Sequence, residues 1–299
     1  MNASAPHILC IGSVLWDIIG RSPHGMAHGA DVPGRITRVP GGVAMNIAMT
    51  LRKLGLRPAV LTVIGRDAEG DELIAVCQRL GIDAQFAYRS PDRPTDRYMA
   101  VEDLHGLVAA IADAHSLEAA GDRILAPLAD GRLGSAARPW AGLIAIDGNL
   151  TTALLAEIAR SSLFVAADLR VAPASPGKAE RLQSLLGHPR ATLYVNLEEA
   201  GLLCDTRFDD AITAARGLLD RGAARVLVTA GDRECCDGAR GAEFVCGVPE
   251  KVRVHRVTGA GDVFMGAHLV AERAGADREA ALAAALRAAS AHVAGEIGT

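Results

Sequence analysis

The chain alternates two kinds of segment from residue 7 onward, and this alternation most restricts its fold. Short apolar runs rich in β-branched residues are followed by longer Ala- and Leu-rich stretches with helical spacing. This order is typical of βα units that build a mainly parallel sheet flanked by helices, so the sequence predicts the α/β class. The expected strands are His7–Ile11, Ala59–Ile64, Gly142–Ile146, Leu163–Ala167, Thr192–Val195 and Arg225–Thr229, and the expected helices are Ala44–Leu54, Asp71–Leu80, Thr151–Arg160, Lys178–Leu186 and Asp209–Arg221.

Two segments interrupt the alternation. Gly20–Pro40 has few apolar runs and many Gly, Pro and His residues, while Ala84–Ala114 predicts two or three short strands. We therefore expect one domain over residues 1–299, with a small β-sheet subdomain formed by about 14–40 and 84–114. The C-terminal part, Gly259–Gly295, is rich in Ala and predicts helices that pack closely on the main sheet.

Composition excludes several classes of protein. The net charge is −4, the basic residues are scattered, and only 3% of residues are aromatic, which argues against a nucleic-acid polymer as partner. The first seven residues lack the basic segment of a signal peptide, and Asp17 interrupts the apolar stretch that begins at Ile8. We expect a cytoplasmic protein with no membrane partner.

The cysteines do not indicate a metal site or a disulfide framework. The chain has six of them, with no C-x-x-C pair and no His at zinc-finger spacing. Cys235 and Cys236 are adjacent, and neighbouring residues point to opposite faces of a strand. All six are expected to be free thiols.

The strongest chemical signal is the glycine-rich stretch Thr258-Gly259-Ala260-Gly261-Asp262, which precedes a helical run. Small residues at a helix N-terminus leave backbone N–H groups uncovered, where the helix dipole favours a phosphate or an oxyanion. A carboxylate at that end can accept the proton of a substrate hydroxyl. The alternative interpretation is an ordinary Asp cap after a glycine turn.

This stretch resembles the C-terminal motif of the ribokinase-like, or PfkB-type, sugar and nucleoside kinases. The resemblance runs from about residue 7 to the end of the chain, and its motifs occur in the family's order. It implies a ribokinase-like fold, a central mostly parallel β-sheet flanked by helices with a small β-sheet lid. It also implies that Asp262 is the general base and that the N–H groups of Gly259, Ala260 and Gly261 form an anion hole.

The residues that the resemblance assigns to the phosphate acceptor lie near the N-terminus. Gly41 and Gly42, followed by Asn46, resemble the family's G-G-x-x-x-N motif, and Asp17 stands where the family has a substrate-binding Asp. Glycines let a sugar ring approach the backbone, while Asp and Asn side chains bind vicinal hydroxyls. The alternative is a simple turn with a polar residue early in a helix.

The residues that the resemblance assigns to nucleotide binding lie later in the chain. Asn196 and Glu199 match an N-x-x-E motif associated with phosphate and Mg²⁺, although the same pattern also forms a capping box. Thr229 and Gly231 fit the family's nucleotide-contacting turn after a strand, and Thr258 is also assigned to ATP binding. The resemblance therefore implies ATP and Mg²⁺ as cofactors.

Within the family, the chain most resembles pseudouridine kinases. The supporting stretches include the G-G-x-x-x-N motif and Ile146-Asp147-Gly148-Asn149, together with Thr95 and Asp113 in the expected lid. Thr95, Asp113 and Asn149 are therefore assigned to the substrate, with the last two offering hydrogen bonds to a base. As alternatives, Asp147-Gly148-Asn149 is a good turn sequence and Asp113 ends a strand.

The chain also departs from the family. Arg256 stands where a small polar residue is usual in a loop that can bind potassium, which puts a K⁺ site in doubt. Glu234 replaces a frequent Gly near the nucleotide turn, and Asp168-Leu169-Arg170-Val171 lacks the D-P-V-S run associated with pseudouridine kinases. These differences weaken the substrate assignment more than the assignment of the reaction.

The sequence thus predicts an ATP-dependent kinase that phosphorylates the 5′-hydroxyl of pseudouridine. Two alternatives remain: a kinase of the same fold for another nucleoside or sugar, such as ribose, adenosine or a fructose relative, and a catalytically impaired sensor that binds a nucleoside. A dinucleotide-dependent oxidoreductase is excluded, because no G-x-G-x-x-G follows the first strand. Exposed lid strands predict a homodimer.

Overall fold

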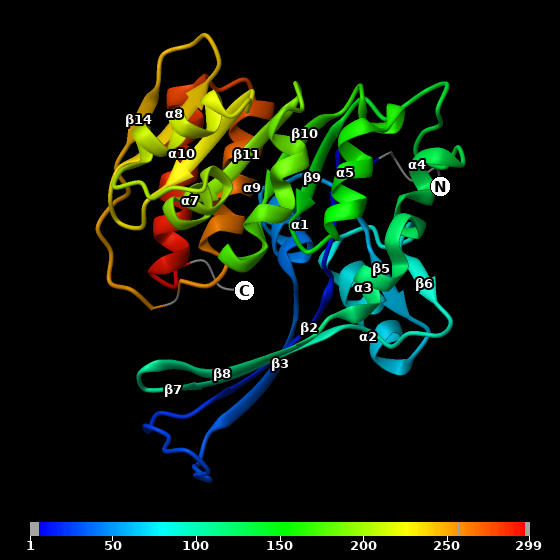
Figure 1. The fold of residues 1–299 in the computed structure, drawn as a ribbon. Helices are drawn as coiled ribbons and strands as arrows, with labels where there is room; N and C mark the ends of the chain where they lie inside the picture. The colour runs from blue at the N-terminus through cyan, green and yellow to red at the C-terminus, as the bar shows by residue number, and fades with distance from the viewer. Residues whose placement is uncertain (1–5, 256, 297–299) are drawn as a thin grey trace.

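A computed structural model of the protein describes residues 6–255 and 257–296. Its centre is an eight-stranded sheet with helices on both faces (Figure 1). The strands from β12 to β4 run parallel, while β13 and β14 are added antiparallel at one edge. The predicted α/β class is confirmed. In spatial order the strands are β14 (Val245–Gly247), β13 (Cys235–Ala239), β12 (Arg225–Thr229), β11 (Ala191–Asn196), β10 (Asp168–Ala172), β9 (Leu143–Asp147), β1 (Ile8–Ile11) and β4 (Pro58–Leu61).

Buried side chains on the two faces of this sheet form two separate apolar clusters. Leu9 and Ile11 of β1 point into one cluster, and Ile8 and Cys10 point into the other. Strands buried on both faces read as continuous apolar runs, which is why the sequence reveals them. The helices are α1 (Val43–Lys53), α2 (Ala68–Leu80), α3 (His115–Ala120), α4 (Ala126–Ala129), α5 (Thr152–Arg160), α6 (Gln183–Leu186), α7 (Leu197–Cys204), α8 (Ala211–Asp220), α9 (Ala260–Arg273) and α10 (Arg278–Val293).

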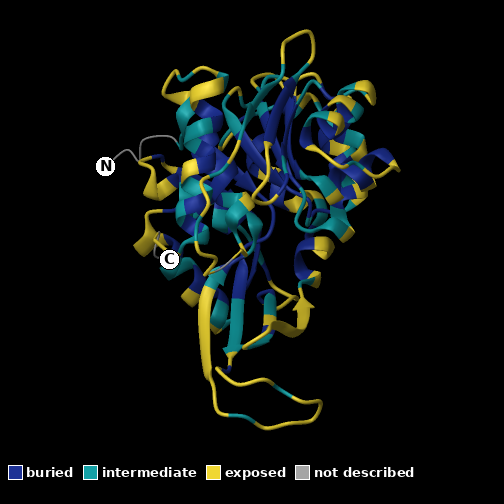
Figure 2. Cartoon of the chain, turned by 90° about the vertical axis from the view of Figure 1, so that its left-hand side faces the viewer, coloured by how far each residue is buried: buried dark blue, intermediate teal, exposed yellow. Residues whose placement is uncertain are grey.

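A second sheet of four strands projects from the main body (Figure 1). Its order is β3-β2-β7-β8, and much of its surface is exposed, including all of β8 (Figure 2). We call it the small sheet. Residues 88–90 form β6, which pairs with β5 in a separate two-stranded sheet and therefore lies outside the small sheet. The bounds are β2 (Leu15–Arg21), β3 (Arg35–Gly41), β5 (Val63–Gly65), β6 (Tyr88–Ser90), β7 (Arg97–Asp103) and β8 (Gly106–Asp113).

The prediction of a strand at Leu163–Ala167 is wrong. Residues Ser162–Phe164 form a 3₁₀ turn, and the strand β10 begins at Asp168. Asp168 and Arg170 interrupt the apolar character of β10. In the structure the buried guanidinium of Arg170 lies 2.7 Å from Asp168 Oδ1, so a buried strand can carry both charges.

Two other expected elements differ from the structure. The single strand expected at Ala59–Ile64 divides at Thr62 into β4 and β5. The helix expected at Lys178–Leu186 is a 3₁₀ segment, η3 (Pro176–Leu182), followed by the single turn of α6. A further 3₁₀ segment, η1, covers Gly121–Leu125. Within the described parts of the chain, no helix has both the length and the apolar character needed to cross a bilayer.

Candidate active site

The N-terminus of α9 presents backbone donors beside a carboxyl group. Gly259 caps this helix with φ 83°, a left-handed conformation that favours glycine. The N–H of Ala260 donates to the carbonyl of Val257 at 3.1 Å, so Ala260 does not offer the open donor that the sequence suggested. Among the described residues, the N–H groups of Gly261 and Asp262 have no such partner, and the space over Gly261 is open.

Asp262 lies in the first turn of α9 and meets the N-terminal part of α1. The Asn46 side chain donates through Nδ2 to Asp262 Oδ2 at 2.9 Å. The structure thus brings together two residues that the sequence assigned to one site from opposite ends of the chain. The contact leaves the other carboxylate oxygen of Asp262 free of this bond, so it can face a substrate hydroxyl.

The surroundings of Asp262 make it a base near neutral pH. Burial raises the pKa of this carboxyl group to about 7, and the hydrogen bond from Asn46 acts in the opposite direction. The neighbouring carboxylates of Asp147, Glu199 and Asp17 add to the rise. A general base works best when its pKa lies close to the working pH, and Asp262 fits that requirement.

Asp17 lies on β2, and two glycines shape the backbone around it. Burial raises the pKa of Asp17 to about 6. A Cβ atom on Gly41 would stand 2.0 Å from Oδ2 of Asp17, so any larger residue there would displace the Asp17 carboxylate. Gly42 needs to be glycine for another reason, because its φ is +90° and a Cβ would meet the carbonyl oxygen of Ser13 at 2.4 Å. Both glycines therefore position the expected acceptor residues.

Asp147 is a residue that the sequence analysis treated only as part of a turn. Its buried carboxylate accepts hydrogen bonds from the N–H groups of Ser13 at 2.7 Å, Ala44 at 3.0 Å and Asn149 at 2.8 Å. Burial raises the pKa of Asp147 and these N–H groups oppose the rise. Its position at the end of the apolar strand β9 is the signal that could have identified it. Asp147 joins the ends of β1 and β9 to the start of α1, where Asn46 lies.

Thr95 is held by hydrogen bonds to Asp67 and Gly65. Its buried hydroxyl donates to Asp67 Oδ1 at 2.5 Å and accepts from the N–H of Gly65 at 3.2 Å. The N–H of Thr95 donates to the other oxygen of Asp67 at 2.7 Å. These bonds attach the base of the small sheet to the turn before α2. Thr95 therefore has a structural role in the folded chain, and its assignment to the substrate stays a prediction.

Asp113 lies on the face of the small sheet opposite Asp17, the other residue that the sequence assigned to the substrate. It pairs with Arg97, which in turn pairs with Trp16. Asp17 is the next residue on β2 after Trp16 and therefore points to the opposite face, as neighbouring residues of a strand do. Residues that pair directly across a sheet share a face, so Tyr98 lies on the same face as Asp17 and Asp113 does not.

Asn149 lies at the carboxyl end of β9, as expected, but its side chain is occupied. Its Oδ1 accepts a hydrogen bond from Lys178 Nζ at 2.6 Å. Lys178 belongs to η3, which follows β10. This oxygen can accept a second hydrogen bond, but the lysine already takes one of its two acceptor positions.

Asn196 and Glu199 form the reciprocal capping box at the start of α7. Asn196 Oδ1 accepts from the Glu199 N–H at 2.9 Å, and Glu199 Oε2 accepts from the Asn196 N–H at 2.8 Å. Burial raises the pKa of Glu199 to about 7, while the bond from Asn196 opposes the rise. The second oxygen of Glu199 suits Mg²⁺, which proteins usually hold through one or two carboxylates with water and substrate phosphates. In the described part of the chain no group of three metal-binding side chains gathers.

The remaining expected nucleotide residues lie at or near the end of β12 and before α9. Thr229 ends β12, and Gly231 follows with φ +69° and open space around it. Thr258 is exposed, and its carbonyl accepts a hydrogen bond from Nε2 of His292 on α10 at 2.9 Å. The prediction about Arg256 and potassium falls outside the described residues.

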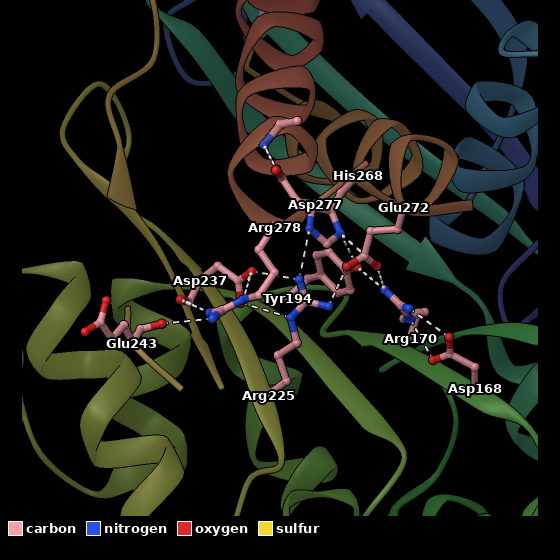
Figure 3. A network of polar contacts seen from close by, with 11 residues as sticks. Asp168, Arg170, Tyr194, Arg225, Asp237, Glu243, His268, Glu272, Asp277 and Arg278 are labelled. Atoms are coloured by element: carbon pink, nitrogen blue, oxygen red, sulfur yellow. Dashed lines mark hydrogen bonds and ion pairs between the residues drawn. The ribbon is translucent and has the colours of Figure 1, made fainter. Parts of the chain in front are cut away.

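A buried network of charged and polar groups holds the C-terminal half of α9 on the sheet (Figure 3). Glu272 pairs with Arg170 of β10 and, at 2.5 Å, with Arg225 of β12. Burial acts to raise the pKa of Glu272, but Arg170 and the other cations outweigh it and the pKa is lowered. Tyr194 of β11 bonds to Nδ1 of His268 at 2.8 Å. The network continues through Asp168, Asp237 and Arg278.

Comparisons with known proteins identify the family of this chain. Residues 5–296 match the pfkB family carbohydrate kinase model. The chain is 29% identical over 267 residues to the uncharacterized sugar kinase YeiI of Escherichia coli (strain K12), covering 87% of this chain and 70% of that protein. It is 27% identical over 263 residues to the pseudouridine kinase of the same organism, covering 87% of this chain and 81% of that protein.

Solved structures show the same fold. A carbohydrate kinase from Agrobacterium tumefaciens superposes with a TM-score of 0.77 at 28% identity, covering 94% of this chain and 89% of that one. A ribokinase from Thermotoga maritima has a TM-score of 0.77 at 24% identity, with coverages of 97% and 93%. The ribokinase-like fold predicted from the sequence is confirmed. This chain belongs to the pfkB family of carbohydrate kinases, and it is a phosphotransferase that acts on a hydroxyl group.

Proposed function

We propose that this kinase transfers the γ-phosphoryl group of ATP to the 5′-hydroxyl of pseudouridine. The observation that carries the mechanism is the carboxyl group of Asp262, held by Asn46 beside the open N–H groups at the start of α9. The hydroxyl proton passes to Asp262 while the hydroxyl oxygen bonds to the γ-phosphorus. The bond from that phosphorus to the β–γ bridging oxygen breaks, and ADP leaves.

On the acceptor side, Asp17 and Asn46 bind hydroxyl groups of the ribose. Asp17 accepts and Asn46 both donates and accepts, which suits vicinal hydroxyls. Tyr98 takes the place that the sequence gave to Asp113, because it shares the face of Asp17 on the small sheet. Its ring can lie against the base of a nucleoside.

On the nucleotide side, Asn196, Thr229, Gly231 and Thr258 contact ATP. Mg²⁺, when bound through Glu199, neutralises charge on the phosphates. The N–H groups of Gly261 and Asp262 stabilise the charge of the transferred group, with the helix dipole adding to their effect. Gly259 supports this arrangement through its left-handed conformation.

The small sheet closes over the acceptor and joins a second copy of the chain. Its face opposite Asp17 carries the exposed apolar side chains of Ile36, Met99 and Ile111. A sheet with both edge strands open and an apolar face exposed is poorly suited to remain alone in water. Closure excludes water from the transfer and limits ATP hydrolysis.

The substrate assignment rests on the resemblance to pseudouridine kinases and on Tyr98 beside Asp17. The similar level of identity to a sugar kinase favours, as a second candidate, a kinase of this fold that acts on a free sugar. Purified enzyme with Mg²⁺ and ATP should be supplied in parallel with pseudouridine, uridine, adenosine, ribose and fructose while ADP release is measured. Turnover highest with pseudouridine supports the proposal, whereas turnover of ribose or fructose without pseudouridine turnover overturns it.

A further inference from the structure

Lys178 is a cation near the carboxyl ends of the central strands, and the neutral amide of Asn149 holds it. Its ammonium donates to the amide oxygen of Asn149 at 2.6 Å, and the side chain is half-buried. Within the part of the chain that the structure describes, no carboxylate lies within ion-pair distance of it. An amide oxygen holds an ammonium group less strongly than a carboxylate does, so this contact can be exchanged for a stronger one.

Nearby basic side chains are committed to structural contacts. Arg181, three residues further on, pairs with Glu118 at 3.0 Å and also donates to the backbone carbonyl of Leu150. Arg170, in the strand before η3, is paired with Asp168 and Glu272. Both arginines are paired with carboxylates, whereas the Lys178 ammonium has no carboxylate partner among the described residues.

The order of strands places Lys178 between the two halves of the active site. Parallel strands bring their carboxyl ends to one edge, and ligands of α/β proteins bind there. Lys178 follows β10 and bonds to a residue just after β9. In the sheet, β10 and β9 lie between β11, which leads to Asn196, and β1, which leads to the turn before Asp17. The lysine thus lies between the nucleotide side and the acceptor side.

A short chain of hydrogen bonds connects Lys178 to the acceptor side. Asn149, which receives the lysine, donates its N–H to Asp147 at 2.8 Å. Asp147 in turn binds the N–H of Ala44, at the start of the helix that carries Asn46. The lysine is therefore separated from the α1 N-terminus by two residues, and its flexible four-carbon side chain gives it reach.

The site also needs a cation. Asp17, Asp147 and Glu199 lie at or near the carboxyl ends of β1, β9 and β11, at the same edge of the main sheet as the start of α9, and a triphosphate that binds there adds further negative charge. Mg²⁺ neutralises part of that charge. A second positive group that is free to contact the phosphoryl group would stabilise it during transfer.

We propose that Lys178 is a further catalytic residue: when ATP binds, its ammonium group leaves the Asn149 amide and contacts the γ-phosphoryl group. The proposal rests on the phosphoryl transfer proposed above, but it does not depend on which acceptor is phosphorylated. Asn149 then holds the lysine in the free enzyme, and its freed side chain can face the acceptor. Asn149 therefore binds Lys178 in the free enzyme and the acceptor in the ATP complex.

The test compares Lys178→Met with Lys178→Arg and with Lys251→Met, an exposed lysine on the loop after β14. Turnover is measured with whichever acceptor the wild type uses best. We expect Lys178→Met to lower kcat at least about a hundredfold, as losing one donor to a developing charge does. Lys178→Arg should recover part of that loss because it keeps the charge, and Lys251→Met should match the wild type.

Binding of ATP and ADP by calorimetry supplies a measurement independent of turnover. In Lys178→Met the Kd for ATP should rise about tenfold or more while the Kd for ADP stays unchanged, since only ATP carries the γ-phosphoryl group. Equal weakening of both nucleotides, or an unchanged kcat, overturns the proposal. If Lys178→Met does not fold, as judged by circular dichroism, Lys178→Gln replaces it. Failure of the proposed pseudouridine activity alone would leave the ATP-to-ADP comparison intact.

Discussion

The side-chain amide of Asn46 donates a hydrogen bond to Oδ2 of Asp262 at 2.9 Å, across 216 positions of sequence. The bond joins the first turn of α1 to the first turn of α9. It therefore fixes the position of the expected acceptor-binding motif relative to the expected anion hole. Neither residue could orient the other without the sheet between β1 and β12, because that sheet supports both helices.

Replacing Asp262 by Asn should abolish most of the activity. The amide of Asn keeps the shape of the side chain and can still contact Asn46, but it cannot accept the hydroxyl proton. The value of kcat should therefore fall at least about a hundredfold, which corresponds to about 3 kcal/mol in the activation barrier. Steady-state kinetics with the best acceptor measure this loss, and thermal unfolding checks that the fold is kept. Wild-type turnover in Asp262→Asn would refute the base role.

The activity should rise with pH through about 7. Asp262 acts as base only when ionised, and its pKa is about 7, so kcat/KM should fall as the pH drops below that value. Asn46→Leu removes a hydrogen bond that favours the ionised form of Asp262. The pH at which kcat/KM falls to half of its maximum should therefore move to a higher value. Profiles of kcat/KM against pH for both enzymes test the shift, and a move of this pH to a lower value contradicts the assignment.

A methyl group at position 41 should weaken acceptor binding. A Cβ on Gly41 would overlap Asp17 Oδ2, and the carboxylate would have to move away from its present place. Gly41→Ala should therefore raise the KM for the acceptor about tenfold or more, with the KM for ATP unchanged. Gly20→Ala is the matched control, because the nearest atoms to its Cβ lie 3.9 Å away. Equal effects of the two substitutions would show that Asp17 is not the cause.

Glu272→Gln should destabilise the fold strongly. It leaves the guanidinium groups of Arg170 and Arg225 without their shared carboxylate, and breaking a buried ion pair in this way costs about 3–5 kcal/mol. Urea unfolding at pH 7 measures the free energy of unfolding. Glu157→Gln, on the exposed side of α5, should change it by less than about 0.5 kcal/mol.

The difference between wild type and Glu272→Gln should also depend on pH. The folded pKa of Glu272 lies below its ordinary value of 4.5, so its contribution is present above that value and is lost as the pH falls through the folded pKa. The two proteins should therefore approach each other in stability under acid conditions. A difference that stays constant down to pH 3 would mean that the carboxylate charge is not responsible.

The apolar face of the small sheet should hold two copies together. Ile111 is 61% exposed on that face, and Ile111→Lys should convert a dimer to a monomer in light scattering because a buried unpaired charge opposes association. Val165→Lys is the control, since Val165 is equally exposed at 61% but lies on the main body. A wild-type protein that is monomeric at micromolar concentration would contradict the prediction.

The sequence predicted more of the fold than of the site. Continuous apolar runs identify central strands because both faces of the sheet are covered, and β1, β9, β11 and β12 follow from that pattern. β10 does not, because Asp168 and Arg170 interrupt its apolar character. Only the folded chain brings Glu272 to Arg170 and makes that charge tolerable.

Local sequence by itself determined the α/β class, the helices α1, α2, α5 and α8, and the small residues at the start of α9. Tertiary structure alone decided which side chains meet: it turned Asp113 away from Asp17, tied Thr95 to Asp67, and placed Asp147 and Lys178 at the sheet edge. The reason is physical. Helix and strand formation depend on neighbours in the chain, whereas the face that a strand residue presents depends on pairing with distant strands.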